Sequence, residues 1–384
     1  MAKSGLHSFK KFMDITFFNQ PENKAWLNLC LVPGIGPKTM LCIQEANLSA
    51  LQVYELDPKM LATLGINKKS VAHLQLYPPH CQSKEVEETL KWAANEGHYL
   101  LTLKDTKYPE RLKQIATAPP LLMVKGQVDV LQYEQLAIVG SRHPTQAGIQ
   151  QAYEFSEQLT HMGLSITSGL AQGIDASAHS GALQAGGVTL AVLGSGLNKI
   201  YPKQNLRLSE EICERGALIS EFGLNTAANP GHFPRRNRIV SGLSMGTLVI
   251  EATLKSGSLI TARQALEQNR EVFAIPGPIN NPQKAGCHHL IRQGATLIES
   301  VEQIAQELRW QHEIQQPKQT RPNLISAHMS PIEQTLIKAL DYEGANLDEL
   351  VRRTKLSVAD INVVLMGLEL SGVVRQEQGD YSLR

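Results

Sequence analysis

Between Gln135 and Glu299 the sequence alternates between short apolar runs and segments whose apolar residues have helical spacing. The runs are QLAIVG, LSITSG, TLAVLG, ALISEF, TLVIEA, EVFAIPG and ATLIES, and segments such as QAYEFSEQLTHMG and LITARQALEQN separate them. Short apolar strands joined by helices are typical of parallel sheets that are buried on both faces. The alternation therefore predicts an α/β domain with a mostly parallel, doubly wound sheet between two layers of helices.

The residues after each apolar run are small or hydrogen-bonding, and they mark the candidate site. The loops include Gly140-Ser141-Arg142, Gly169-Leu170-Ala171-Gln172-Gly173 and Lys255-Ser256-Gly257-Ser258. In open parallel sheets, ligands bind beyond the carboxyl ends of the strands, where the strand order reverses. Glycine there lets a phosphate approach backbone N–H groups closely. The sequence therefore predicts a site for a polyanion along one edge of the sheet.

Basic residues are concentrated in these same loops, although the chain as a whole is nearly neutral. The sequence has 37 Lys and Arg against 36 Asp and Glu, a net charge of +1. The loops hold Arg142, Lys199, Lys203, Arg235, Arg236 and Arg238, together with the aromatic residues Tyr201 and Phe233. Cations neutralise phosphates, and aromatic rings stack on unpaired bases. This combination predicts a single-stranded nucleic acid as the ligand.

Each candidate residue also has a purely structural interpretation. Arg142 could cap a helix or pair with Glu221 or Glu251, and the arginines after residue 234 could belong to a solvated turn. The glycines after the second run could serve close helix–strand packing, and Asp175 could cap the following helix. The functional interpretation depends on the coincidence of all these residues at one predicted edge.

Several common sites are disfavoured by the sequence. Gly194-Ser195-Gly196 follows an apolar run, but Lys199 replaces the third glycine of a dinucleotide fingerprint and Pro202 disrupts the helix that should follow. The motif GxxxxGK[ST] does not occur, which excludes nucleotide hydrolysis by a phosphate-binding loop. No nucleophile elbow accompanies the histidines, and Cys287-His288-His289 lacks the second ligand pair of a typical zinc site. We therefore expect no metal, no cofactor and no catalytic residue.

The cysteines and the N-terminal residues bear on the compartment. The 5 cysteines form no CxxC pair, so we expect a reducing interior rather than a disulfide framework. MAKSGLHSFKKFMDITFF has no apolar core of a signal peptide, and no later stretch of about 20 uncharged apolar residues occurs. We expect a cytoplasmic protein that has no membrane partner.

The N-terminal segment has a different pattern from the large domain. From Asn23 to Leu76, short helical patterns are joined by tight turns, and the turn PGIGPKT from Pro33 to Thr39 resembles a helix-hairpin-helix. Such a turn either offers N–H groups to a DNA phosphate or uses glycine only for a positive φ. Residues 81 to 135 contain an amphipathic helix and strands that lead into the large domain.

The C-terminal segment predicts a winged helix. Residues 312–329 are polar and without period, as in a linker, and three helical patterns and a β-hairpin follow. Residues 330–384 hold 6 basic and 9 acidic residues, so their charge is −3, which suits protein docking better than duplex DNA. We expect four parts: a helical domain of the SAM or helix-hairpin-helix type (1–80), the large domain (81–311), the linker (312–329) and the winged helix (330–384).

The loop sequences resemble the signatures of the DNA-processing protein A (DprA/Smf) family. The matching motifs are GSR, SGLAQGID, LGSGLNKIYPKQN, SEF, FPRRNRIVSGLS, EATLKSGSLITA and FAIPG, in that order between Gly140 and Gly277. The resemblance implies a Rossmann-like domain that binds single-stranded DNA and protects incoming strands in natural transformation. It also implies a homodimer, help in loading the RecA recombinase, and no enzymatic activity.

The resemblance also implies roles for individual residues. Arg142 would clamp a phosphate, Lys199 and Lys203 would line the same groove, and Phe233 with the arginines that follow it would border that groove. The full set of expected DNA-binding residues is Gly140, Ser141, Arg142, Gly169, Gly173, Lys199, Lys203, Asn205, Phe233, Arg235, Arg236, Asn237, Arg238, Ser256, Gly257 and Thr261.

Two other functions remain open at this point. MGTLVIEATLKSG is similar to the loop of Rossmann-like nucleotide phosphoribohydrolases, in which a glutamate at the position of Glu251 does acid–base chemistry. That family is expected to have PGGxGT, whereas here Gly242-Leu243-Ser244-Met245 precede the glycine and threonine, which argues against catalysis. The other possibility is an adaptor protein whose DNA contacts are incidental.

Overall fold

The computed structural model describes Phe18, residues 20–79, Cys81, and residues 83–310, 330–340, 345–370, 374–377 and 380–383. The chain divides into two compact units, Met1–Ile314 and Gln315–Arg384. The predicted linker, residues 312–329, lies outside the described residues, and so do residues 1–17 of the predicted N-terminal domain. The finer division into four parts stays a prediction.

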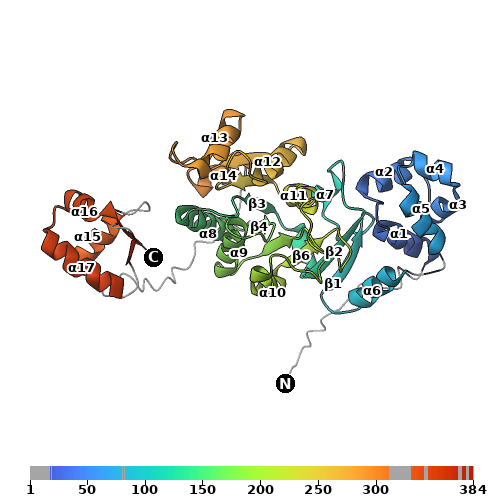
Figure 1. The fold of residues 1–384 in the computed structure, drawn as a ribbon, viewed down its shortest axis with the longest axis horizontal. Helices are drawn as coiled ribbons and strands as arrows, with labels where there is room; N and C mark the ends of the chain where they lie inside the picture. The colour runs from blue at the N-terminus through green and yellow to red at the C-terminus, as the bar shows by residue number, and fades with distance from the viewer. Residues whose placement is uncertain are drawn as a thin grey trace, which may run out of the picture. The chain divides into compact units, whose positions relative to one another are not determined.

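A single large sheet organises the larger unit (Figure 1). The strand order is β1-β2-β6-β5-β4-β3-β7-β8-β9. The strands are β1 (His98–Thr102), β2 (Leu121–Gly126), β3 (Gln135–Val139), β4 (Ser165–Ser168), β5 (Thr189–Val192), β6 (Ala217–Ser220), β7 (Gly246–Val249), β8 (Glu271–Ala274) and β9 (Thr296–Leu297). Strands β3 to β9 pair in parallel, whereas β1 and β2 add an antiparallel edge.

The strand order reverses once, next to β3. The chain builds outward from β3 to β6, then returns to place β7 on the other side of β3, and continues outward to β9. This is the doubly wound order of a Rossmann-like sheet, so the predicted fold class is confirmed. The reversal puts a crevice beyond the carboxyl ends of β3 and β7, between loops that run to opposite faces of the sheet.

Helices cover both faces of the sheet because alternate residues of each strand point to opposite sides. Ala137 and Val139 of β3 share a cluster with α11 (His232–Leu243), α12 (Ser258–Glu267) and α13 (Ala285–Arg292). Leu136 and Ile138 share a cluster on the opposite face with α8 (Gln146–His161), α9 (Ile174–Gln184) and α14 (Val301–Glu307). Near β6, α10 (Leu206–Arg215) and α6 (Lys84–Ala93) continue that second layer.

Short helices joined by turns fill residues 20–79, as the sequence predicts. They are α1 (Pro21–Leu31), α2 (Pro37–Glu45), α3 (Ala50–Glu55), α4 (Pro58–Thr63) and α5 (Lys68–Leu76). Gly34, in the turn before α2, has φ +90°, and a Cβ there would lie 2.5 Å from Asn67 Nδ2. This turn therefore needs glycine for its own conformation and packing, and phosphate binding by it stays a prediction. Leu27 of α1 shares a cluster with Val86 of α6, so these helices pack against the sheet domain.

The smaller unit has the three helices and hairpin that the sequence predicts. Its elements are α15 (Pro331–Leu340), β10 (Ala345–Asn346), α16 (Leu347–Thr354), α17 (Val358–Leu370), β11 (Val374–Glu377) and β12 (Asp380–Leu383). The short β10 pairs with β12 and completes a three-stranded sheet of order β10-β12-β11. Leu336, Leu350, Ile361 and Leu365 are buried between the helices.

Candidate nucleic-acid interface

A pocket of about 650 Å³ opens at the switch point of the sheet. The loops after β3, β4 and β7 form its walls, together with the first turns of α11 and α12. It brings together ten of the predicted site residues: Gly140, Ser141, Arg142, Gly169, Phe233, Arg236, Asn237, Ser256, Gly257 and Thr261. These residues are up to 121 positions apart in the chain (Gly140 to Thr261), and the winding of the sheet places them in one cavity.

An aromatic ring and a cation form the rim of this pocket. The guanidinium carbon of Arg142 lies 4.9 Å from the centre of the Phe233 ring. The Tyr201 ring lies 5.8 Å from the Phe233 ring, tilted by 43°. Phe233 sits against Gly194, where a Cβ would come within 2.8 Å of the ring. Both Arg142 and Tyr201 are exposed, so the rim offers a positive charge and flat apolar surface to solvent.

The floor of the pocket contains a buried pair of opposite charges. Arg236 is 4% exposed and donates to the carbonyl of Val192, while its Nε has no partner among the described residues. Burial lowers the pKa of Arg236 to about 10, and the nearby charge of Asp175 opposes this shift. Burial also raises the pKa of Asp175, again against the charge of Arg236. Arg236 therefore stays protonated at neutral pH, and its buried Nε–H is without a partner among the described residues.

Asp175, Gly173 and Asn205 hold the loop between β4 and α9 in place. The Asp175 carboxylate accepts from the N–H groups of Gly169 (3.1 Å) and Ala171 (3.3 Å). Asn205 donates to the carbonyls of Leu170 (2.9 Å) and Ala171 (3.2 Å) of the same loop. Gly173 has φ +78°, and a Cβ there would lie 2.5 Å from the Ser141 carbonyl oxygen. Gly173 and Asn205 lie outside the pocket lining and shape its wall.

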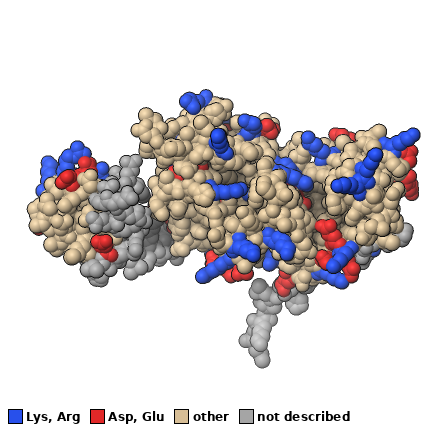
Figure 2. All heavy atoms as spheres, in the orientation of Figure 1, with Lys and Arg blue, Asp and Glu red and all other residues tan. Residues whose placement is uncertain are grey.

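Lys199 and Lys203 lie on the loop that carries Tyr201 to the rim. Both lysines are exposed and neither belongs to the lining of the pocket. Figure 2 shows that Lys and Arg side chains gather over the middle of the larger unit on the face drawn there, with fewer Asp and Glu among them.

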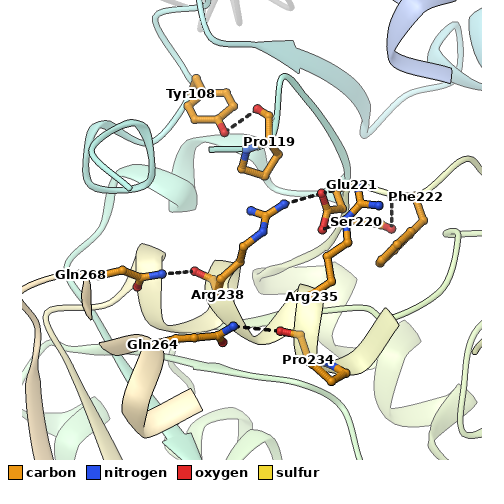
Figure 3. A network of polar contacts seen from close by, with 10 residues as sticks. All are labelled: Tyr108, Pro119, Ser220, Glu221, Phe222, Pro234, Arg235, Arg238, Gln264 and Gln268. Atoms are coloured by element: carbon orange, nitrogen blue, oxygen red, sulfur yellow. Dashed lines mark hydrogen bonds and ion pairs between the residues drawn. The ribbon is translucent and has the colours of Figure 1, made fainter. Parts of the chain in front are cut away.

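Two of the three predicted arginines of α11 point away from the pocket. Figure 3 shows Arg235 and Arg238 directed at Glu221, the residue that follows β6. Glu221 Oε2 lies 2.9 Å from Arg235 and 2.5 Å from Arg238, and Oε1 accepts from Arg235 Nε at 3.1 Å. Since these arginines lie within α11, the alternative of a solvated turn is wrong. Glu221 therefore pairs with Arg235 and Arg238, and the alternative of a pair with Arg142 is not realised.

Glu251, the candidate acid–base residue of a nucleotide hydrolase, is occupied elsewhere. Its carboxylate is fully buried and accepts from the N–H (2.9 Å) and the hydroxyl (2.7 Å) of Thr145. Thr145 in turn caps α8 by accepting from the N–H of Gly148 (3.0 Å). Glu251 does not belong to the lining of the pocket. Its contacts in this structure are those of a residue that joins β7 to the start of α8.

The part of the chain that the structure describes holds no group of three or more His, Cys, Asp or Glu side chains able to bind a metal ion. Cys287 is buried against the carbonyls of Val249 and Ile250, whereas His288 Nε2 lies 3.0 Å from the Gly277 carbonyl oxygen. None of the described helices is both long and apolar enough to cross a membrane.

Comparison with known proteins gives the family. The model of DNA recombination-mediator protein A matches residues 99–309, and the model of the DprA winged helix domain matches residues 316–380. Protein Smf of Escherichia coli is 38% identical over 94% of this chain and 95% of its own length. This chain belongs to the DprA/Smf family.

Other DprA/Smf proteins match smaller shares of the chain. DNA processing protein DprA of Streptococcus pneumoniae is 44% identical over 54% of this chain and 74% of its own length. The X-ray structure of that protein matches with a TM-score of 0.64 and 34% identity, over 75% of this chain and 98% of the solved one. A structure of Helicobacter pylori DNA processing protein A, described by its single-stranded DNA binding mode, matches with a TM-score of 0.50 and 29% identity. The match covers 55% of this chain and 95% of the solved one.

Sequence reasoning missed part of this DprA/Smf pocket. Ala228 and Pro230, before α11, and Gln283, before α13, also line it. Gln283 donates to the His143 carbonyl (2.9 Å) and so ties the two walls together. None of the three follows an apolar run directly, so the pattern that found the other residues gave no signal for them.

Proposed function

We propose that this protein binds single-stranded DNA at the switch-point pocket without catalysing a reaction. The observation that carries the proposal is the Arg142 guanidinium over the Phe233 ring at the rim. An unpaired base can stack on the exposed aromatic surface while its phosphates meet the cations beside it, and a base pair cannot do so without unstacking. The Helicobacter pylori relative, described as a single-stranded DNA binder, supports the same ligand.

Affinity for a labelled oligo-dT strand, measured by fluorescence anisotropy at several salt concentrations, tests the proposal. Each phosphate contact that is lost lowers the salt slope of a single-strand complex by about 0.7. We therefore expect Arg142→Ala with Lys203→Ala to bind more weakly and with a smaller slope. Arg207→Ala is the matched control, because Arg207 is exposed on α10 and paired with Glu211. Unchanged affinity in the double variant, or no salt dependence in the parent protein, would count against the proposal.

We also propose that the bound strand is transferred to the RecA recombinase in natural transformation, and that the large domain forms a homodimer. The family description, a recombination mediator, supports a recombinase as the partner. Pull-down of the recombinase by the parent protein and by the double variant separates this function from DNA binding. Recombinase binding together with normal function in the double variant would favour the adaptor hypothesis instead.

The rival enzyme has its own test. Under our proposal, nucleoside monophosphates are not cleaved by the protein. Phosphoribohydrolase turnover that disappears in Glu251→Gln would replace the binding proposal by an enzymatic one. Under that outcome the contacts of Glu251 with Thr145 would have to open in the working state.

A further inference from the structure

Glu221 forms the charged anchor of α11. Its side chain is 1% exposed, and its two oxygens take three hydrogen bonds from Arg235 and Arg238. Arg238 is itself buried, while Arg235 is 41% exposed at its side chain. A carboxylate this far from water is stable only because both guanidinium groups stay in place.

The opposite side of α11 faces the pocket. Phe233, Arg236, Asn237 and Val240 line the cavity at positions i, i+3, i+4 and i+7 of the helix. Arg235 and Arg238 lie three residues apart on another side. Because a helix is rigid, a rotation that moves the two anchored arginines also moves the Phe233 ring at the rim and the Arg236 guanidinium at the floor.

Besides Glu221, α11 is held by its apolar residues in the core of the sheet and by hydrogen bonds to its neighbours. On the α12 side, Gln264 donates to the carbonyl of Pro234 (3.1 Å) and Gln268 to that of Arg238 (3.0 Å), as Figure 3 shows. These are single bonds to backbone carbonyls, whereas Glu221 holds two side chains at once. The first turn of α11 contains Arg235 and no acidic residue of its own. The Glu221 charge therefore also offsets a cation near the positive end of the helix dipole.

We propose that Glu221 is a positioning residue for strand binding: it holds Arg235 and Arg238 and thereby fixes Phe233 and Arg236 at the pocket. The inference rests on the proposed function. If Glu221 has this positioning role, Arg235 and Arg238 are not phosphate ligands, although the family resemblance implies that they border the groove.

Two substitutions test this role because charge alone predicts a different result for each of them. Glu221→Gln removes a negative charge near a polyanion site, so simple electrostatics predicts tighter binding of oligo-dT. Arg235→Lys keeps the charge but loses the two-pronged contact with Glu221, so charge alone predicts unchanged binding of the strand. Positioning predicts that both variants bind more weakly, by about five- to 150-fold, the range that corresponds to losing one base–aromatic stack.

A stacking signal separates positioning from general destabilisation. An oligonucleotide with one 2-aminopurine is quenched when that base stacks, and we expect less quenching by Glu221→Gln and Arg235→Lys at saturating protein. The salt slope stays the same, because no phosphate contact is removed. Each variant is assayed below its own unfolding transition. Arg235 is partly exposed, so Arg235→Lys keeps the test decisive if Glu221→Gln does not fold.

Glu88→Gln is the matched control. Glu88 is also a carboxylate beside the loop after β6, where it accepts from Asn225 (2.9 Å), and its two polar partners, Asn225 and Lys84, lie outside α11. We expect this variant to bind as the parent does. Tighter or unchanged binding by Glu221→Gln, or full quenching by Arg235→Lys, would overturn the inference. Failure of the parent protein to bind oligo-dT at all would instead overturn the proposed function.

Discussion

At the scale of single residues, the pocket floor depends on how closely Arg236 packs. Its guanidinium lies directly under Gly169, and a Cβ on Gly169 would come within 2.1 Å of one terminal nitrogen. Arg236 is buried, donates to the Val192 carbonyl and lies near the charge of Asp175, so its guanidinium has little room to shift. Packing against Arg236 therefore requires glycine at position 169. The backbone conformation there would allow other residues.

The first prediction concerns Gly169→Ala. The added methyl group must displace the Arg236 guanidinium, and overpacking of this kind typically costs about 1–3 kcal/mol. We expect a loss of that size in the free energy of unfolding by urea, together with weaker binding of oligo-dT. Gly257→Ala is the control within the same pocket, because no atom lies within 4 Å of a Cβ built there. Equal stability of the two variants would contradict this account of the floor.

The second prediction concerns pH and His179. This side chain is fully buried in α9, with Nδ1 2.7 Å from Thr189 Oγ1, and burial lowers its pKa to about 3. Below the ordinary histidine pKa of about 6.5, the unfolded chain binds a proton that the folded chain does not. The contribution of neutral His179 to the free energy of unfolding is therefore fully present above about pH 6.5. It falls by about 1.4 kcal/mol per pH unit as the pH drops toward 3.

Urea unfolding of the parent protein and of His179→Gln at pH 7, 6 and 5 checks this assignment. We expect the variant to lose stability less steeply on acidification than the parent, by about 1.4 kcal/mol per pH unit between pH 6 and 5. A variant as steep as the parent would assign the acid sensitivity to other groups.

At the scale of elements, the start of α8 joins two strands that flank the switch point. Thr145 caps the helix and also donates its hydroxyl hydrogen to Glu251, which follows β7. One hydroxyl thus satisfies a helix terminus and a buried carboxylate. The loop after β3, which carries Arg142, ends at this cap.

The third prediction concerns Thr145→Ala. The variant loses an N-cap, which typically costs about 0.5–2 kcal/mol. It also leaves Glu251 with one partner fewer, which adds about 1–3 kcal/mol. We expect a loss of about 2–4 kcal/mol in the free energy of unfolding, whereas Thr145→Ser, which keeps the hydroxyl, remains close to the parent. A loss below about 1 kcal/mol in Thr145→Ala would show that water replaces the hydroxyl.

The elements themselves were largely predictable from the sequence. Every apolar run between Gln135 and Glu299 overlaps a strand, because parallel strands buried on both faces need continuous apolar residues. The two-residue β10 was not predicted, since Ala345 and Asn346 are too few to give a period. The loop residues at the strand ends could be placed at one edge because the topology of parallel sheets leaves them no other position.

The direction of each side chain on α11 was not predictable in the same way. Arg235, Arg236 and Arg238 are identical in type and adjacent in sequence, and only helical spacing separates them. Which of them faces the pocket depends on the partner that each finds, and Glu221 lies in a distant loop. Glu221 follows β6, so its position depends on how β6 pairs with β5. The sequence does not give that pairing, and it therefore could not show that Glu221 forms ion pairs with Arg235 and Arg238.

At the scale of the whole molecule, the two units differ in their suitability for nucleic acid. The basic residues that flank the pocket all belong to the larger unit. In the smaller unit, α17 occupies the recognition position of a winged helix, yet its sequence VADINVVLMGLEL contains no Lys or Arg. Its exposed residues include Val363 (73%) and Met366 (68%), which suit contact with protein rather than phosphate.

The fourth prediction concerns removal of residues 312–384. We expect the remaining chain to keep the oligo-dT affinity of the parent within about threefold and to keep its salt slope, because our proposal assigns the phosphate contacts to the larger unit. Anisotropy titrations at two salt concentrations compare the two proteins. A slope that falls by 1 or more on truncation would assign phosphate contacts to the removed residues.

The reversal of strand order at β3 has a mechanical consequence. The pocket walls come from both halves of the sheet, and β3 and β7 are joined along the seam between them by backbone hydrogen bonds. An oligonucleotide that contacts both walls adds a second connection in parallel with those bonds. When tension is applied across the seam, the loaded protein then yields at a higher force than the empty one.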